Sequence, residues 1–101
     1  MGGWVDAGVG GEAAVAVGRA LAALAHSHQV LVVTHLPQVA AFAGSHLVVE
    51  KLAEGGRTVA RLRRVEGTER VVELARMLSG RPDSETARRH AEELLQSAGA
   101  A

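Results

Sequence analysis

The sequence of 101 residues contains no cysteine and has only one tryptophan and one phenylalanine. The absence of cysteine excludes disulfides, thiolate catalysis and cysteine-ligated metal sites. Because large aromatic anchors are scarce, the apolar content consists mainly of alanine, valine and leucine, which fill the interfaces between helices and strands. A chain of this length forms one small domain with a modest core.

An excess of charge of either sign is also lacking, because eleven basic residues balance eleven acidic residues. The charge of the whole chain therefore gives no argument for binding to nucleic acid or to an anionic membrane. No apolar run reaches the roughly 18 residues of a membrane span. No basic region followed by an apolar stretch marks a signal peptide. We therefore expect a cytoplasmic protein without membrane contact.

The first part of the sequence predicts a loop, a helix and a buried strand. Residues 1–11 contain five glycines and predict a loop with tight turns. Residues 12–26 place an apolar side chain at every third or fourth position, which predicts a helix. Residues 29–34 are mostly apolar and β-branched, which is typical of a central parallel strand buried on both faces.

The second part predicts a short helix, a hairpin and two amphipathic helices. Pro37 suits the first turn of the short helix, Gly44 its end, and Asp83 or Ser84 the N-cap of the last helix. The predicted elements are a helix at 37–43, strands at 47–49 and 58–65 around a turn at 54–56, and helices at 68–79 and 84–96.

Alternation in the predicted strand 58–65 separates apolar from basic residues. Ala60 and Leu62 share one face and Arg61 and Arg63 share the other, which indicates an edge strand or a one-sided strand. The basic stripe continues at Arg64, but no aromatic residues alternate with it, so it gives little support for a nucleic-acid site.

The apolar run at 29–34 lacks clear parallel neighbours in this sequence. A single parallel strand cannot form a sheet alone, so we expect further strands to lie upstream in a longer protein. Without them, Leu31 and Val33 would be poorly covered, and we expect marginal stability or self-association.

His35 follows this apolar run and is the best candidate for a functional side chain. Open α/β sheets place their ligands at the carboxyl ends of their strands. An imidazole at such a position can bind a phosphate oxygen or orient a water molecule. The alternative is a purely structural histidine that caps the following turn.

The glycine-rich stretch Val5–Gly11 leads into the first predicted helix and is the second candidate. Backbone N–H groups of such a stretch can bind an anion. However, no apolar strand precedes it and it lacks the Gly-Lys-Ser/Thr ending of a phosphate-binding loop, so a flexible connection is the alternative. His26 and His28 lie at a helix end without a third ligand, and we predict no metal site.

Two strings of residues at a suitable distance resemble the end of the ATPase head of the RecN family. This is a family of bacterial DNA-repair proteins related to the structural-maintenance-of-chromosomes (SMC) ATPases. The strings are Val5-Asp6-Ala7-Gly8-Val9-Gly10-Gly11-Glu12-Ala13-Ala14 and Val33-Thr34-His35-Leu36-Pro37-Gln38-Val39-Ala40. The resemblance continues through Glu73–Gly80 and His90–Leu95, so it covers nearly everything after Trp4.

The resemblance implies an α/β fold, namely the C-terminal fragment of a P-loop (ABC/SMC-like) ATPase head with strands flanked by helices. Residues 1–101 would form a single partial domain. Within it, residues 1–11 would be the D-loop region, 12–65 a helix and strands, and 66–101 the C-terminal helices.

The resemblance also implies roles for individual residues. The D-loop, which crosses the interface when two heads enclose ATP, would comprise Asp6, Ala7, Gly8, Val9 and Gly10. His35 would be the switch histidine that faces the γ-phosphate. ATP and Mg²⁺ would be the cofactors of the complete head. The partners would be the rest of the head or a second head, and DNA would be bound indirectly through the full-length, nucleoid-associated protein.

The sequence departs from the family where catalysis would take place. The family has an apolar strand ending in Asp-Glu directly before Val5, but here Gly3 and Trp4 occupy those two places. The phosphate-binding loop and the signature motif are also lacking. We therefore expect a segment of a repair ATPase that acts in double-strand-break repair only when it is joined to the rest of the head. The alternative is a non-catalytic interaction module.

The purified chain is predicted to have no ATPase activity and to require no cofactor by itself. The groups that bind the triphosphate, coordinate the metal and activate water are lacking, and phosphoryl transfer depends on such fixed groups. A phosphate-release assay with ATP and Mg²⁺ measures this directly. Magnesium-dependent turnover by the chain alone would show that the prediction is wrong.

Overall fold

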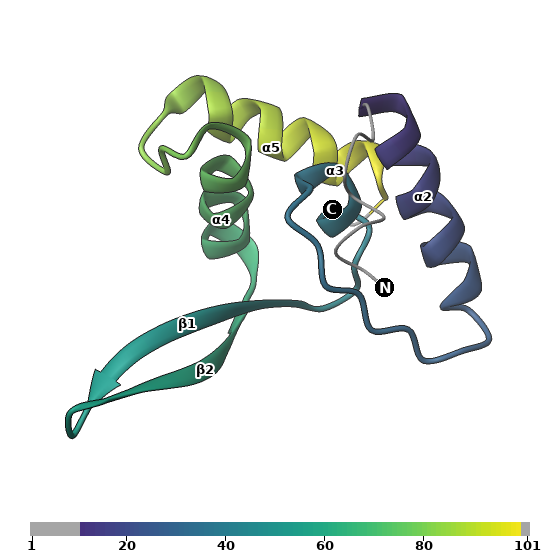
Figure 1. Cartoon of the computed structure of the whole chain (residues 1–101). Coiled ribbons are helices and arrows are strands. Elements are labelled where there is room, and N and C mark those ends of the chain that lie inside the picture. The colour runs from purple at the N-terminus through teal and green to yellow at the C-terminus, as the bar shows by residue number, and fades with distance from the viewer. Residues whose placement is uncertain (1–10, 100–101) are drawn as a thin grey trace.

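The structure, a computed structural model, describes residues 11–99. Helix α3 lies in contact with each of the other three helices, and the β1–β2 hairpin projects away from them (Figure 1). The chain is thus a small α/β piece. Its elements are α2 (Gly11–Leu24), α3 (Pro37–Ala40), β1 (His46–Glu54), β2 (Arg57–Val65), α4 (Gly67–Ser79) and α5 (Glu85–Ser97).

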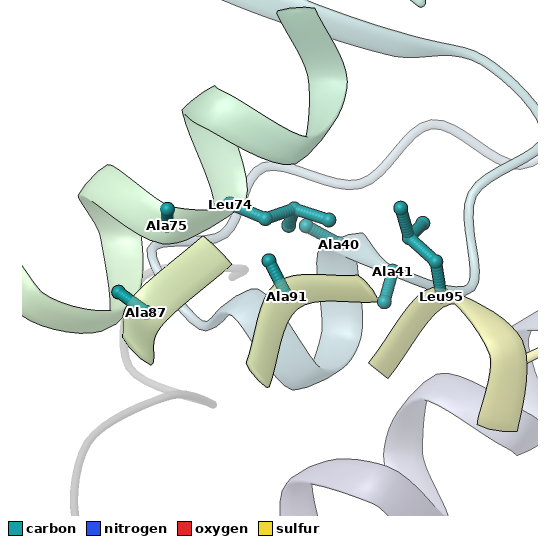
Figure 2. Close-up of a cluster of buried hydrophobic side chains, with 7 residues drawn as sticks. All are labelled: Ala40, Ala41, Leu74, Ala75, Ala87, Ala91 and Leu95. Carbon is teal, nitrogen blue, oxygen red and sulfur yellow. The ribbon is translucent and has the colours of Figure 1, made fainter. Parts of the chain in front are cut away.

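The core lies where α3, α4 and α5 meet. Leu74 of α4 is fully buried and points toward the end of α3, while Ala75 lies next to Ala87 of α5 (Figure 2). Because most of these side chains are alanines, the helices approach one another closely and the buried apolar area stays small. The buried cluster consists of Ala40, Ala41, Leu74, Ala75, Ala87, Ala91 and Leu95.

The two C-terminal helices agree with the sequence prediction, including their ends. The Ser84 hydroxyl accepts a hydrogen bond from the Ala87 N–H at 3.2 Å and so acts as the N-cap of α5. Gly80 ends α4 with a φ of 73°, in the left-handed region that favours glycine. Local signals of this kind do not depend on the rest of the fold, which explains why they predict these helices correctly.

The hairpin lies where the sequence predicts it, but its first strand runs over His46–Glu54 rather than over residues 47–49 alone. Gly55 and Gly56 have φ values of 58° and 77° and form the two-residue turn between the antiparallel strands. Leu62 pairs with Val49 on one face and Arg61 with Glu50 on the other. The apolar face is open, because Leu62 and Val49 are 65% and 63% exposed.

The predicted buried strand at 29–34 is wrong for this structure. These residues form a connection between α2 and α3 (Figure 1), and Leu31 and Val33 are 86% and 76% exposed. The physical reason is that a parallel strand needs hydrogen-bonding neighbours, and the two strands among residues 11–99 pair with each other. The expectation that Leu31 and Val33 would be poorly covered is confirmed.

Helix α3 is shorter than the predicted helix at 37–43. Pro37 does begin it, but it ends at Ala40, and its C-cap is Ala41 in a right-handed conformation rather than Gly44. Helix α2 likewise ends at Leu24, two residues before the predicted end.

Gly18 is the point of closest approach between α2 and the segment that follows α3. A Cβ atom at Gly18 would lie 2.4 Å from Cδ2 of Phe42 and 3.2 Å from the Gln38 carbonyl oxygen. The guanidinium of Arg19 lies over the Phe42 ring, 5.5 Å from its centroid, at the distance of a cation–π contact. Phe42 is therefore the side chain that packs against the glycine side of α2.

Replacing Gly18 by alanine is predicted to destabilise the chain, with Gly11→Ala as the matched control. Both changes improve helix propensity, but no other atom of residues 11–99 lies within 4 Å of a Cβ at Gly11. Overpacking against Phe42 and Gln38 should make Gly18→Ala less stable than Gly11→Ala by about 1–3 kcal/mol. Urea denaturation followed by circular dichroism measures the difference, and equal midpoints for the two variants would contradict the contact.

Candidate functional site

His35 lies at the apex of a tight turn directly before α3. The Thr34 hydroxyl accepts a hydrogen bond from the Leu36 N–H at 3.0 Å and closes this turn. Pro37 then begins α3, and its fixed φ angle continues the chain into the helix. The His35 side chain is exposed at the surface.

The structure tests only part of the predicted site. His35 was predicted at the end of a buried strand, and it instead follows an exposed connection, although the helix after it begins at Pro37 as predicted. The predicted D-loop residues Asp6, Ala7, Gly8, Val9 and Gly10 lie outside residues 11–99. Their position relative to His35 therefore stays a prediction.

Arg70 of α4 binds the backbone at the carboxyl end of α3. Its Nη2 atom lies 3.2 Å from the carbonyl oxygen of Ala40, 3.3 Å from that of Ala41 and 2.6 Å from that of Ala43. Carbonyl groups at a helix end have few internal partners, although that of Ala40 also accepts the Ala43 N–H at 3.1 Å. A cation at this end also interacts favourably with the helix dipole.

Arg70 is unusually buried for a charged residue, with 9% of its surface exposed. Burial lowers its pKa from the usual value, although a guanidinium stays protonated. Its Nε atom has no hydrogen-bond partner among the described residues. Because a buried charge is costly unless it is well bonded, the bonds to the three carbonyl oxygens are what make this position tolerable.

His46, the first residue of β1, is buried near Arg70. Its Nδ1 atom has no hydrogen-bond partner within residues 11–99. Burial lowers the pKa of His46, and the positive charge of Arg70 lowers it further, while Glu73 partly opposes this. His46 is therefore held in its neutral form in the folded chain.

Neither Arg70 nor His46 was identified from the sequence as a functional candidate. A signal for Arg70 exists, because it lies four residues before Leu74 and so shares the inward face of α4. An arginine among the inward-facing apolar residues of a helix requires a buried hydrogen-bond partner. The position of Arg70 in the sequence therefore indicates that its side chain binds a buried group. His46 has no comparable signal, because only the tertiary structure covers the base of the hairpin.

The basic stripe of β2 is neutralised by acidic neighbours. Arg61 pairs with Glu54 at 3.4 Å and Arg64 with Glu66 at 3.1 Å, and Arg63 contacts both Glu50 and Glu69. These pairs are largely exposed and contribute little to stability. They leave little free positive charge on the stripe, in agreement with its weak support for a nucleic-acid site.

Neither a metal site nor a membrane-spanning helix is found in the part of the chain that the structure describes. No group of three His, Asp or Glu side chains there is placed to hold a metal ion. None of the helices in that part combines the length and the apolarity needed to cross a membrane.

Comparison with known proteins finds relatives of this chain among bacterial proteins. No family model matches the chain. However, it is 65% identical over 96 residues to a protein of Streptomyces coelicolor, 58% over 91 residues to one of Deinococcus radiodurans and 42% over 94 residues to one of Bacillus subtilis.

Each of these three relatives is named DNA repair protein RecN. The matches cover 95%, 90% and 93% of this chain but only 17%, 16% and 16% of the relatives' own lengths. The resemblance predicted from the motifs is therefore confirmed, and the chain is a segment of the RecN type, consistent with the C-terminal part of such a protein.

The buried neutral His46 predicts that the folded chain loses stability in acid. Its folded pKa lies below the ordinary value of 6.5, so the unfolded chain binds a proton at a pH where the folded chain does not. The free energy of unfolding should thus be flat above pH 6.5 and fall as the pH drops below it.

Urea denaturation at pH 7.5 and pH 5.5 measures this effect, with His46→Leu as the comparison. The variant should show a smaller loss between the two pH values. An equal loss in both proteins would assign the acid sensitivity to other groups, such as the carboxylates around β2.

Proposed function

We propose that this chain is the C-terminal segment of a RecN-type ATPase head, and that it acts in the recombinational repair of DNA double-strand breaks when joined to the rest of that head. The observation that carries the proposal is the Thr-His-Leu-Pro-Gln-Val string at 34–39, in a chain 65% identical to a RecN protein. The P-loop ATPase fold belongs to the whole head and is part of this proposal.

His35 is the residue of the described segment that would act on the nucleotide. Its exposed imidazole fits a phosphate oxygen, because a ring N–H can donate a hydrogen bond to it. Phosphoryl transfer depends on such positioned donors around the transferred group. Among residues 11–99 no grouped carboxylates fit Mg²⁺, so the metal and the triphosphate would be held by the rest of the head.

The exposed residues Leu31 and Val33 support the joining of this segment to further strands. A continuous apolar run fits a parallel strand that is covered on both faces, and here it is exposed. In the complete head, strands of the missing part would cover it and bring His35 to the edge of the sheet. A second head would then meet Asp6–Gly10 across the bound ATP, and DNA would be engaged through the full-length protein.

A second candidate function is a non-catalytic interaction module. The observation that favours it is the open β1–β2 hairpin, whose free edges and exposed Leu47, Val49 and Leu62 suit pairing with a partner's strand. Reading the DNA upstream of the Met1 codon separates the two candidates. An open frame that encodes an apolar strand ending in Asp-Glu supports the ATPase head, and a ribosome-binding site without such a frame supports the module.

In a complete head that carries this segment, His35→Ala is predicted to impair ATP hydrolysis far more than ATP binding. Loss of one donor to a developing charge lowers kcat by about a hundredfold, while other groups still hold the nucleotide. Steady-state hydrolysis and the Kd for ATP measure the two effects, with His90→Ala on the exposed face of α5 as the control. Equal losses of binding and hydrolysis would mean that His35 is structural.

A further inference from the structure

Helix α3 needs outside support to keep its conformation. It has only four residues, and its N-cap Leu36 provides no side-chain hydrogen bond. Helices of this length are not stable by themselves in water. Because His35 stands one residue before that N-cap, any shift of α3 also shifts the His35 turn.

Arg70 provides this support from a distant part of the chain. It reaches Ala40, Ala41 and Ala43 across 30, 29 and 27 residues of sequence. The bonds therefore connect α4 with α3 and do not merely stabilise a local turn. Since the guanidinium is buried, water competes little for these carbonyl oxygens and the bonds hold α3 firmly.

On the side of α3 that faces α4 and α5, apolar contacts do not fix its orientation to the same degree, although its other side packs closely against α2 at Gly18. Its contacts with α4 and α5 are made largely by Ala40 and Ala41 against Leu74 and Leu95 (Figure 2). Contacts between such small side chains are non-directional, and they tolerate a rotation or a small slide of the helix. Hydrogen bonds to three defined carbonyl oxygens do not, because their strength falls steeply with distance and angle.

We propose that Arg70 is a positioning residue for His35: by fixing the carboxyl end of α3 to α4, it fixes the turn that presents the imidazole. This inference rests on the proposed function, in which His35 faces the γ-phosphate. Arg70 itself touches neither nucleotide nor metal in this proposal. It acts through α3 alone.

The test uses a complete RecN-type head that carries this segment, with two changes at Arg70. Arg70→Met keeps much of the apolar volume and removes the hydrogen bonds. Because all three bonds come from the single nitrogen Nη2, Arg70→Lys keeps the charge and offers one ammonium group on a different stem as a partial replacement. Lysine should restore part of the function if positioning depends on bonds to the carbonyl oxygens.

Two controls separate positioning from general stability. Arg88→Met removes an exposed arginine that donates a hydrogen bond to the Pro82 carbonyl oxygen, far from α3 in sequence. Ala87→Gly weakens α5 by about 1 kcal/mol, at the end of the core cluster away from Ala40 and Ala41 (Figure 2). Neither change touches the carbonyl groups that Arg70 binds.

Arg70→Met is expected to lower kcat about tenfold to a hundredfold, because a displacement on the order of 1 Å can cost that much in a positioned site. The KM for ATP should stay nearly unchanged. The kcat of Arg70→Lys should lie between those of Arg70→Met and the parent protein. In nuclear magnetic resonance spectra of the 101-residue chain, the His35 ring resonances should shift or broaden with Arg70→Met. They should stay in place with Arg88→Met and Ala87→Gly.

Several outcomes would overturn the inference. One is that Arg70→Met leaves kcat unchanged while His35→Ala lowers it. Another is a loss of kcat that Ala87→Gly reproduces, because the effect would then reflect stability. If Arg70→Met does not fold, an Arg70→Lys protein with parental kcat and parental His35 resonances overturns it. Failure of His35→Ala to affect hydrolysis would instead refute the proposed function, while the resonances still report whether Arg70 positions the turn.

Discussion

The hydrogen bonds from Arg70 to the backbone after α3 join the two halves of the described structure. One half contains α2 and the Phe42 contact with Gly18, and the other contains the hairpin, α4 and α5. The alanine-rich core between them buries little area, so it cannot by itself fix how the halves meet. Arg70, a buried cation with defined acceptors, supplies that missing direction. Burial lowers the pKa of His46 beside it, and the charge of Arg70 lowers this pKa further.

The sequence predicts those parts of the fold whose signals are local. Ser84 caps α5 and Gly80 ends α4 because the bonds and dihedral angles involved lie within a few residues. The same holds for the Gly55–Gly56 turn, which sets the register of the hairpin. Arg70 and His46 could not be assigned a role in this way, because what they contact is decided by how α3, β1 and α4 pack together.

The wrong prediction at residues 29–34 has a different origin. The pattern of the segment is that of a strand, but a strand also requires partners, and no pattern within the segment can supply them. For His35 the consequence is mixed. The turn that holds His35 depends on its neighbours Thr34, Leu36 and Pro37, and the start of the helix at Pro37 is predicted from the sequence. The strand that was expected before His35 depends on distant residues instead.

The exposed apolar residues and the similarity to RecN have one common explanation under the proposed function. Leu31, Val33 and Leu62 are each more than half exposed in a chain that spans only 17% of the length of its Streptomyces coelicolor relative. Their pattern suits neighbours that the rest of such a head would provide. The Arg70 bonds, in contrast, are satisfied within residues 11–99. The segment would therefore bring to the head a turn whose local geometry is already fixed, and the head would provide the sheet against which that turn is used.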